Sequence, residues 1–505
     1  MIDNKRIAKN TLAMYFRMFI FMGIGFYTSR IILNTLGVED YGINNVVGGI
    51  VAMLTFFNGA LLSATYRNIT YELATNDLGK IKKVFGASLS AHIMLALLIF
   101  VISETIGLWL FYNKMQIPAE RMNAAFFVYH FSVISTMLSV TIIPYNALIV
   151  AHERMSAFAW MSILDAILKL AIVYLLVIIP FDKLIIYSFL FFIVSLVDQI
   201  IFVIYAFRNF PESKTFCVFD KELLSQTLSF TGWSMFGNLA GTLYTQGLNI
   251  LLNVFFGPVV NAAYGISVQV QGQVQKFIGN FQSALNPQII KTYAAGDLDD
   301  MHKLMYRSAR FSFFLMLILT MPIMLETNYI LTLWLKIVPE NTVIFFRIIM
   351  CSTLIYTVAN PMIVANQATG QIKKYQIVCG CILLSIVPIS YILLKIGFPA
   401  YSVFIVHFFV ELICQYARMH MLKGQISISL SSCFTNIYKP ILLVVLFSSV
   451  LPLIPFFLLE ESFIRLLLTG VTSVLNTCLS IYCYGLSERE KEFLKSKLKR
   501  YLNNN

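Results

Sequence analysis

The sequence predicts an all-α polytopic membrane protein with about fourteen transmembrane helices. Three observations predict this class. Hydrophobic residues make up 58% of the chain and charged residues 12%, with a mean hydropathy of +0.76, whereas soluble domains carry about 25% charged residues. Apolar windows long enough to cross a bilayer recur along the whole chain. A stretch near residue 37 also recurs near residue 257, which indicates a duplicated helical bundle.

The apolar windows define the expected helices in chain order. A helix needs roughly 20 apolar residues to cross about 30 Å of hydrocarbon. The windows cover 11–35, 42–65, 85–111, 122–148, 157–179, 184–207, 227–254, 258–285, 308–330, 343–367, 376–396, 400–421, 440–459 and 465–484. The second and eighth windows carry the most polar residues, so hydropathy alone defines them least well.

Basic residues predict the orientation of these helices. Lysine and arginine concentrate in the connections that would lie on the side of the N-terminus, while the opposite connections hold few, such as Lys114, Lys183 and Lys336. The positive-inside rule therefore places both termini in the cytoplasm. The same bias accounts for the net charge of +12, so no nucleic-acid partner is expected. The apolar run that begins at Thr11 is interpreted as a retained first helix and not as a cleaved signal peptide.

Sequence features required for catalysis are missing. The connections are too short to fold into the outer domain on which a membrane polymerase or glycosyltransferase would carry its catalytic residues. The chain contains no phosphate-binding G-x-x-x-x-G-K-[ST] motif, and its six histidines never fall at metal-ligand spacing. We therefore expect no enzyme activity, no catalytic residue, no metal site and no cofactor.

The seventh helix carries a stripe of polar side chains along one face. Its members recur at intervals of three or four residues and are Asn238, Thr242, Gln246, Asn249 and Asn253. One interpretation is that these amides hold neighbouring helices together. Because helix contacts usually need only one or two such residues, we favour the interpretation that the stripe lines a water-filled cavity.

The internal repeat extends this stripe to the first helix. Aligning the two copies places Gly37 opposite Gly257, Arg30 opposite Asn249 and Asn34 opposite Asn253. Arg30 alone could reach the membrane surface with its long side chain. Its position opposite a polar face instead predicts that Arg30 and Asn34 line the same cavity.

The eighth helix adds a second cation. Gln269, Gln273, Lys276 and Asn280 share one helical face. Such a face would be costly against lipid, so it predicts contact with a cavity. The alternative is an amphipathic helix on the membrane surface.

A charged cluster is expected between the fifth and sixth helices. Asp165 and Lys169 are four residues apart on one helix, and Asp198 lies at a comparable depth on the next. A neutral Asp–Lys pair is the conservative interpretation. The additional carboxylate makes a proton or Na⁺ a candidate coupling ion at these three residues.

These residues resemble a known family. The Leu36–Ile43 segment follows a helix that carries Arg30, and the Pro144–Arg154 stretch leaves the fourth helix. With about fourteen spans, the chain resembles a polysaccharide-unit flippase (O-antigen or capsule repeat) of the multidrug, oligosaccharidyl-lipid, polysaccharide (MOP) exporter superfamily. The resemblance implies a MATE-like fold with two pseudo-twofold six-helix lobes, two further helices and a basic cytoplasmic tail, at 1–210, 211–422, 423–485 and 486–505.

The resemblance also implies a function. Similar proteins turn over an undecaprenyl-diphosphate-linked oligosaccharide from the inner to the outer leaflet of the bacterial inner membrane by alternating access. Arg30 and Lys276 would bind the diphosphate, and the amides would bind the sugars: Asn34, Asn238, Gln246, Asn249, Gln269 and Gln273. The expected partners are this lipid-linked oligosaccharide, membrane lipids, and glycan polymerase or ligase proteins.

Two other functions remain open. A multidrug exporter of the same superfamily would need a carboxylate in the cavity to bind cationic drugs, and the helices expected to line the cavity contain none. A non-transporting scaffold for glycan assembly would need no polar stripes through the bilayer.

Overall fold

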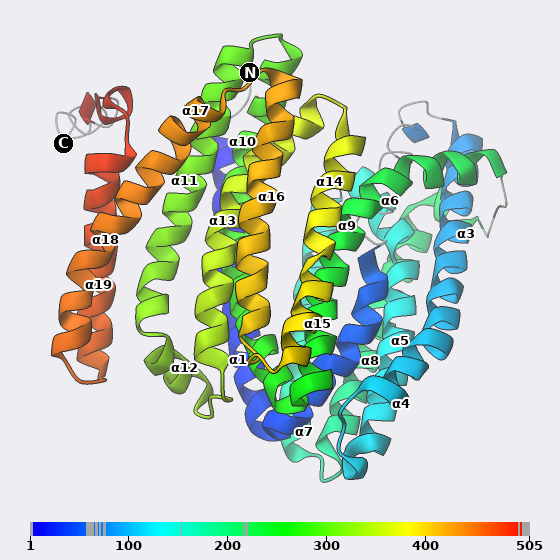
Figure 1. Ribbon diagram of the computed structural model, residues 1–505. Coiled ribbons are helices and arrows are strands. Elements are labelled where there is room, and N and C mark those ends of the chain that lie inside the picture. The colour runs from blue at the N-terminus through cyan, green and yellow to red at the C-terminus, as the bar shows by residue number, and fades with distance from the viewer. Residues whose placement is uncertain are drawn as a thin grey trace. The chain divides into compact units, whose positions relative to one another are not determined.

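The computed structural model describes residues 4–56, 65, 69, 72–73, 77–152, 154–215, 218, 221–492 and 495–496. Every regular element within these ranges is helical (Figure 1), which confirms the predicted all-α class. Within the same ranges, ten helical spans are long and apolar enough to cross a membrane. The helices that carry the predicted polar stripes, at 11–35, 227–254 and 258–285, are not among these ten spans.

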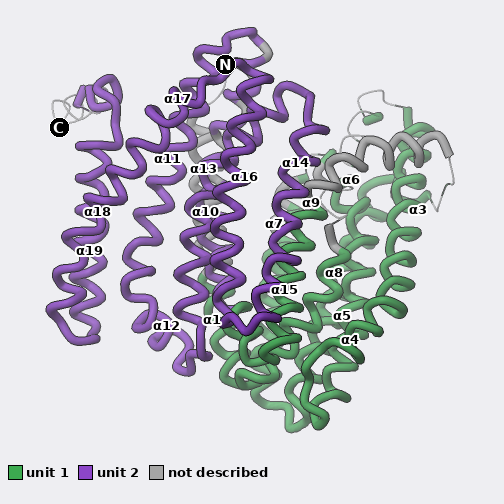
Figure 2. Tube along the Cα trace, in the orientation of Figure 1, with its two compact units in different colours: residues 1–265 green, residues 266–505 purple. Residues whose placement is uncertain are grey.

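The chain divides into two compact units, residues 1–265 and 266–505 (Figure 2). The main helices of unit 1 are α1 (Asn4–Ala52), α3 (Leu78–Ile102), α4 (Leu108–Lys114), α5 (Met122–Thr141), α6 (Ile143–Ala151), α7 (Met155–Ile178), α8 (Lys183–Asn209) and α9 (Lys221–Phe256). Unit 1 also takes the first turns of α10 (Pro258–Ala294), whose remainder belongs to unit 2.

The other helices of unit 2 are α11 (Leu298–Leu325), α12 (Thr327–Leu335), α13 (Thr342–Ala368), α14 (Ile372–Leu384), α15 (Ile386–Ile396), α16 (Ser402–Ile426), α17 (Leu430–Cys433), α18 (Lys439–Leu458) and α19 (Phe463–Ser480). Short 3-10 or π-helical turns connect or extend several helices of the two units: Met53–Phe56, Ser103–Gly107, Ala119–Arg121, Pro211–Lys214, Phe434–Tyr438 and Ile481–Gly485. In the predicted tail 486–505, residues 493–494 and 497–505 lie outside the described part of the chain.

Glycines at equivalent positions of the repeat shape the polar helices. The span expected at 11–35 and residues 42–52 of the span expected at 42–65 are helical and meet at a kink within α1. At the kink Gly37 has φ +81°, a left-handed conformation that costs glycine little because it has no Cβ. Gly257, its partner in the repeat, has φ +78° and separates α9 from α10. The two glycines that the repeat aligned therefore adopt the same left-handed backbone conformation.

Unit 1 is built around α1, α5 and α8, which pack against one another. Val46 and Val47 of α1, Val128 and Tyr129 of α5, and Leu184 of α8 are buried in their shared core. Side chains also start two helices: Asp77 accepts hydrogen bonds from amides in the first turn of α3, and Asp182 does the same for α8.

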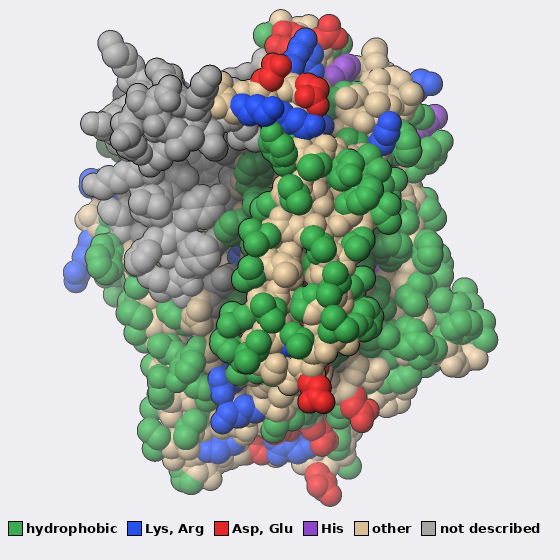
Figure 3. Space-filling view, turned by 90° about the vertical axis from the view of Figure 1, so that its left-hand side faces the viewer, with side chains coloured by type: hydrophobic (Ala, Val, Ile, Leu, Met, Phe, Trp, Pro, Cys, Tyr) green, Lys and Arg blue, Asp and Glu red, His purple; other side chains and the backbone are tan. Residues whose placement is uncertain are grey.

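Unit 2 packs α13 between α11 and α16, while α18 and α19 pack on each other and on α11. Exposed leucine, isoleucine and valine side chains repeat along α18 at 442, 446, 450 and 454. Figure 3 shows an apolar middle on this face, with charged side chains gathered toward both ends. Such a band is typical of a lipid-facing surface.

Two buried ion pairs lie within unit 2, one inside α16 and one between α19 and the turn that follows α11. Arg418 donates to Glu411 at 2.6 Å, and Arg465 donates to Glu326 at 2.8 Å. Each pair removes the net charge that would make burial of a single ion costly.

Candidate functional site

A cluster of buried amides joins three helices of unit 1. Asn249 of α9 is 2% exposed, and its amide nitrogen donates to the backbone carbonyl of Asn45 in α1 at 3.2 Å. Asn261 of α10 donates to both the backbone carbonyl and the side-chain oxygen of Asn249, at 2.7 Å in each case. The middle of the predicted stripe therefore holds α1, α9 and α10 together in this conformation.

The end of the stripe binds a connecting segment. Asn253 is fully buried, and its side-chain oxygen accepts the backbone N–H of Gln116 at 2.8 Å. Its amide nitrogen donates to the Gln116 carbonyl at 3.3 Å. Helix packing thus accounts for two members of the stripe, Asn249 and Asn253. Substrate binding by Asn249 stays a prediction, and it requires that the hydrogen bonds of Asn249 to Asn45 and Asn261 break.

Glycines permit the close approach of these helices. A Cβ on Gly42 would lie 1.8 Å from the carbonyl oxygen of Pro258, and one on Gly265 would lie 2.0 Å from the amide nitrogen of Asn45. On Gly49 it would lie 2.5 Å from the amide nitrogen of Asn249. Small residues at these positions let α1 contact α9 and α10 directly.

The remaining predicted residues of unit 1 are more accessible than Asn249. Arg30 and Gln246 are half-buried, and Asn34 is exposed. Arg30 forms no hydrogen bond or ion pair with any described residue, so its guanidinium is available to an anion. Asn238 lies in α9, but its side chain is outside the described residues.

The predicted residues of unit 2 lie along α10. Gln269 and Gln273 are half-buried, and Lys276 is exposed and forms no ion pair with another described side chain. Gln271 contributes to the packing of α10 on α13, because its side-chain amide donates to the Thr353 hydroxyl at 2.9 Å. Gln271 and Lys276 are five residues apart and lie on different faces of α10.

The structure brings together the predicted charged cluster of unit 1. The Lys169 ammonium lies 2.8 Å from a carboxylate oxygen of Asp165, and Asp198 of α8 lies close enough for its carboxylate to interact electrostatically with Asp165 and Lys169. One lysine cannot neutralise two carboxylates, so the cluster keeps a negative charge unless a proton or cation binds. The Lys169 ammonium also lies 5.5 Å from the ring centre of Phe191.

An ion-pair network that the sequence analysis did not identify lies at the kink of α1. Arg121 donates to Asp40 at 2.8 Å and to Asp182 at 2.6 Å. Burial alone would raise the pKa of Asp182, but hydrogen bonds from Arg121 and two backbone amides outweigh burial and lower it. Burial prevails at Asp40, whose pKa is raised above its ordinary value despite Arg121. The network ties α1 and α8 to the turn before α5.

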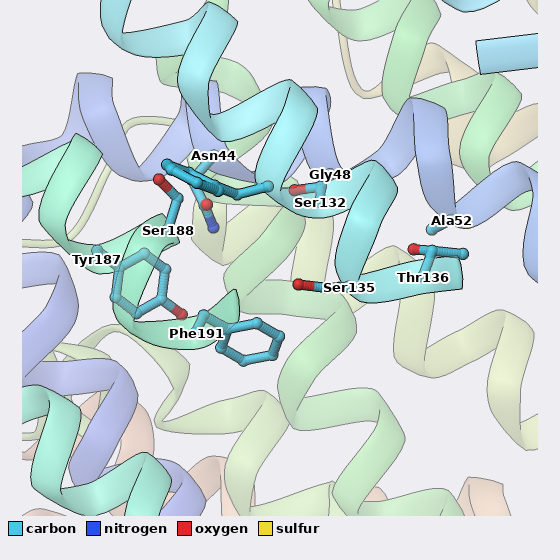
Figure 4. A pocket seen from close by; sticks show the side chains of 10 residues that line it. Asn44, Gly48, Ala52, Ser132, Ser135, Thr136, Tyr187, Ser188 and Phe191 are labelled. Carbon is cyan, nitrogen blue, oxygen red and sulfur yellow. The ribbon is translucent and has the colours of Figure 1, made fainter. Parts of the chain in front are cut away.

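Unit 1 also contains a cavity of about 240 Å³, lined by both polar and apolar side chains, that was not predicted from the sequence (Figure 4). Its walls are Asn44, Gly48 and Ala52 of α1, Ser132, Ser135, Thr136 and Phe131 of α5, and Tyr187, Ser188 and Phe191 of α8. The available signal was the one-face spacing of serine and threonine along α5. Single hydroxyls in apolar helices often bond their own backbone, so this spacing is a weak indication.

Comparison with known protein families gives a match over residues 7–293 to the family described as "Polysaccharide biosynthesis protein". The match spans more than half of the chain. The chain belongs to this family. Comparison with curated protein sequences finds no match.

Solved structures support the fold of this polysaccharide biosynthesis protein. The lipid II flippase MurJ, in an inward closed conformation, has a TM-score of 0.73 at 11% identity, covering 94% of this chain and 98% of MurJ. An inward-facing multidrug resistance MATE transporter of the MOP superfamily has a TM-score of 0.66 at 14% identity, covering 80% and 94%. A MOP superfamily transporter from Pyrococcus furiosus scores 0.56 at 15% identity, covering 81% and 95%. These similarities confirm the predicted MATE-like fold.

Proposed function

We propose that this protein flips a polyprenyl-diphosphate-linked oligosaccharide from the inner to the outer leaflet of the bacterial inner membrane. The observation that carries the proposal is that Arg30 and Lys276 lie on membrane helices without an anionic partner among the described residues. A charge on a membrane helix is costly when it is neither paired nor in contact with water, and it usually marks a binding site or a pathway.

The chemistry of this substrate matches these side chains. A diphosphate carries negative charge, which arginine and lysine bind through charge-assisted hydrogen bonds. Sugar hydroxyls both donate and accept hydrogen bonds, as do the amides Asn34, Gln246, Gln269 and Gln273. The polyprenyl tail is apolar and can stay in the lipid. Family membership and the fold shared with a lipid II flippase support this substrate class.

Turnover of a lipid-linked glycan by the purified protein tests the proposal. We expect wild-type protein in liposomes to expose a fluorescent polyprenyl-diphosphate oligosaccharide on the far leaflet much faster than protein-free liposomes do. Transport of a cationic dye, measured in a parallel set of liposomes, tests the alternative that the protein is a multidrug exporter. Movement of the dye alone under an ion gradient would indicate drug export, and movement of neither would favour a scaffold for glycan assembly, with polymerase or ligase partners.

We further propose that Asp165, Lys169 and Asp198 couple turnover to H⁺ or Na⁺. Replacing Asp198 with asparagine removes the excess carboxylate. If one charge crosses the membrane in each cycle, the membrane potential contributes about 2.3 kcal/mol per 100 mV. This energy corresponds to a factor of about 50 in the ratio of forward to reverse turnover rates. We expect Asp198→Asn to lose this response to imposed potential and ion gradients.

The matched control is Asp299→Asn, which removes an exposed carboxylate from the first turn of α11. The control should keep the wild-type response. An unchanged response in Asp198→Asn would rule out this cluster as the coupling site and would leave the flippase proposal intact.

A further inference from the structure

The cavity between α1, α5 and α8 is lined by hydroxyls, one amide and aromatic rings, and none of its ten lining residues is charged. We propose that this cavity is a subsite for a neutral sugar ring of the transported glycan. The inference rests on the proposed function, and it assigns recognition of one sugar to residues of unit 1 that lie outside the predicted polar stripes.

The absence of charged side chains from the cavity lining indicates the class of ligand that it can bind. A bare metal cation prefers carboxylate or several carbonyl oxygens, and a phosphate prefers arginine, lysine or a cluster of backbone N–H groups. The charged pair Asp165 and Lys169 lies near the cavity, because the Lys169 ammonium contacts the ring of Phe191, which lines it. Neither charged side chain lines the cavity itself. The walls therefore favour a neutral polar ligand over either ion.

Unsatisfied hydrogen-bonding groups in the cavity point to a ligand rich in hydroxyls. Among the polar lining residues, only Ser188 donates its hydroxyl to a described backbone carbonyl, at 2.9 Å. The other five side chains form no hydrogen bond with a described residue, and their polar atoms are not sealed from water-sized molecules: Asn44, Ser132, Ser135, Thr136 and Tyr187. In Figure 4, Ser135 and Tyr187 point toward one another across the space. Hydroxyls and amides can each donate and accept, which matches a polyol.

The size and the aromatic walls favour a single ring. Drug-sized ligands occupy pockets of about 300–1,000 Å³, and this cavity of about 240 Å³ is smaller. Phe131, Tyr187 and Phe191 supply flat apolar surfaces beside the polar groups. A pyranose ring combines an apolar face with hydroxyls at its edge, so it can use both kinds of wall.

The first test removes two hydroxyls and preserves the shape of the cavity. In the double variant Thr136→Val with Tyr187→Phe, we expect the KM for lipid-linked oligosaccharide to rise about tenfold, because two neutral hydrogen bonds are lost. The KM for the same polyprenyl diphosphate without sugars should stay at the wild-type value. The matched control, Thr105→Val with Tyr112→Phe, removes the same two groups from exposed positions on neighbouring turns and should change neither KM.

The second test measures binding without transport. The probe is the oligosaccharide released by mild acid from the bacterium's own lipid-linked intermediate, titrated onto the full chain in lipid nanodiscs. We expect wild-type protein to bind it and Ser135→Leu, which fills the cavity, to lose most of the binding. If Ser135→Leu melts at a lower temperature than wild type, the double variant with preserved shape decides the result.

The outcomes separate the inference from the proposed function. Normal turnover with an unchanged KM for oligosaccharide in the double variant would overturn the subsite and leave the flippase standing. An equal rise in KM for sugar-free carrier would also overturn it, since the effect would be structural. Absence of turnover by wild type, with oligosaccharide binding that depends on the cavity, would overturn the flippase and keep the subsite.

Discussion

Replacing both Arg30 and Lys276 with alanine is expected to lower the rate of lipid-linked glycan turnover at least 100-fold. Each cation is available to a diphosphate, because neither has an anionic partner among the described residues. A hydrogen bond to a charged group contributes about 1.5–3 kcal/mol, so losing two should slow turnover by about 10²–10⁴. The measurement is the initial rate at which the glycan becomes accessible on the far side of proteoliposomes, at substrate concentrations below KM.

Charge-conserving and remote substitutions serve as controls for this result. Arg30→Lys with Lys276→Arg should retain a large part of the activity, because both positive charges remain. Lys303→Ala removes an exposed cation that pairs with Asp300 on α11 and should leave turnover unchanged. Wild-type rates in the double alanine variant would show that the diphosphate binds elsewhere, and the assignment of these residues would be wrong.

Replacing Gly42 with alanine is expected to destabilise unit 1 strongly. The new Cβ would lie 1.8 Å from the carbonyl oxygen of Pro258 and 2.6 Å from its carbonyl carbon. Both are backbone atoms, so no side-chain rotation can relieve the contact and α1 must move away from α10. Overpacking costs about 1–3 kcal/mol and sometimes more, and the displaced hydrogen bonds of Asn249 add about 1 kcal/mol. Thermal unfolding in detergent should show a clearly lower midpoint.

Gly241→Ala is the matched control for this prediction. Gly241 lies inside α9, and a Cβ there would meet nothing within 4 Å. Since alanine favours a helix over glycine by about 1 kcal/mol, this variant should melt at or above the wild-type temperature. A Gly42→Ala protein that melts like wild type would mean that α1 and α10 do not pack as closely as described.

The polar stripe of the seventh helix shows where reasoning from sequence reaches its limit. Helical spacing correctly grouped Gln246, Asn249 and Asn253 on one face. The same spacing fits an amide that binds substrate and an amide that binds a neighbouring helix. Asn249 is bonded to Asn45 and Asn261, and neither partner was part of the predicted stripe. Such contacts join residues that are far apart in the sequence, and helical periodicity does not predict them.

The same limit applies to the cavity. Ser132, Ser135 and Thr136 lie close together in sequence, but Asn44 and Tyr187 complete the cavity from two other helices. No local pattern connects these three segments. The charged cluster was easier to predict, because Asp165 and Lys169 form their contact within a single helix and a charge in an apolar span stands out.

By itself, the sequence determined the membrane class, the order of the helices and the equivalence of Gly37 and Gly257. Apolar length and the conformational freedom of Gly37 and Gly257 are local properties, and the bilayer imposes the same requirement on every span. Only the tertiary structure decided which polar side chains form hydrogen bonds between helices, as Asn249 does, and which remain available to a substrate, as Arg30 does. The physical reason is that a polar group inside a membrane protein must find a partner, and the choice of partner depends on which helices lie side by side.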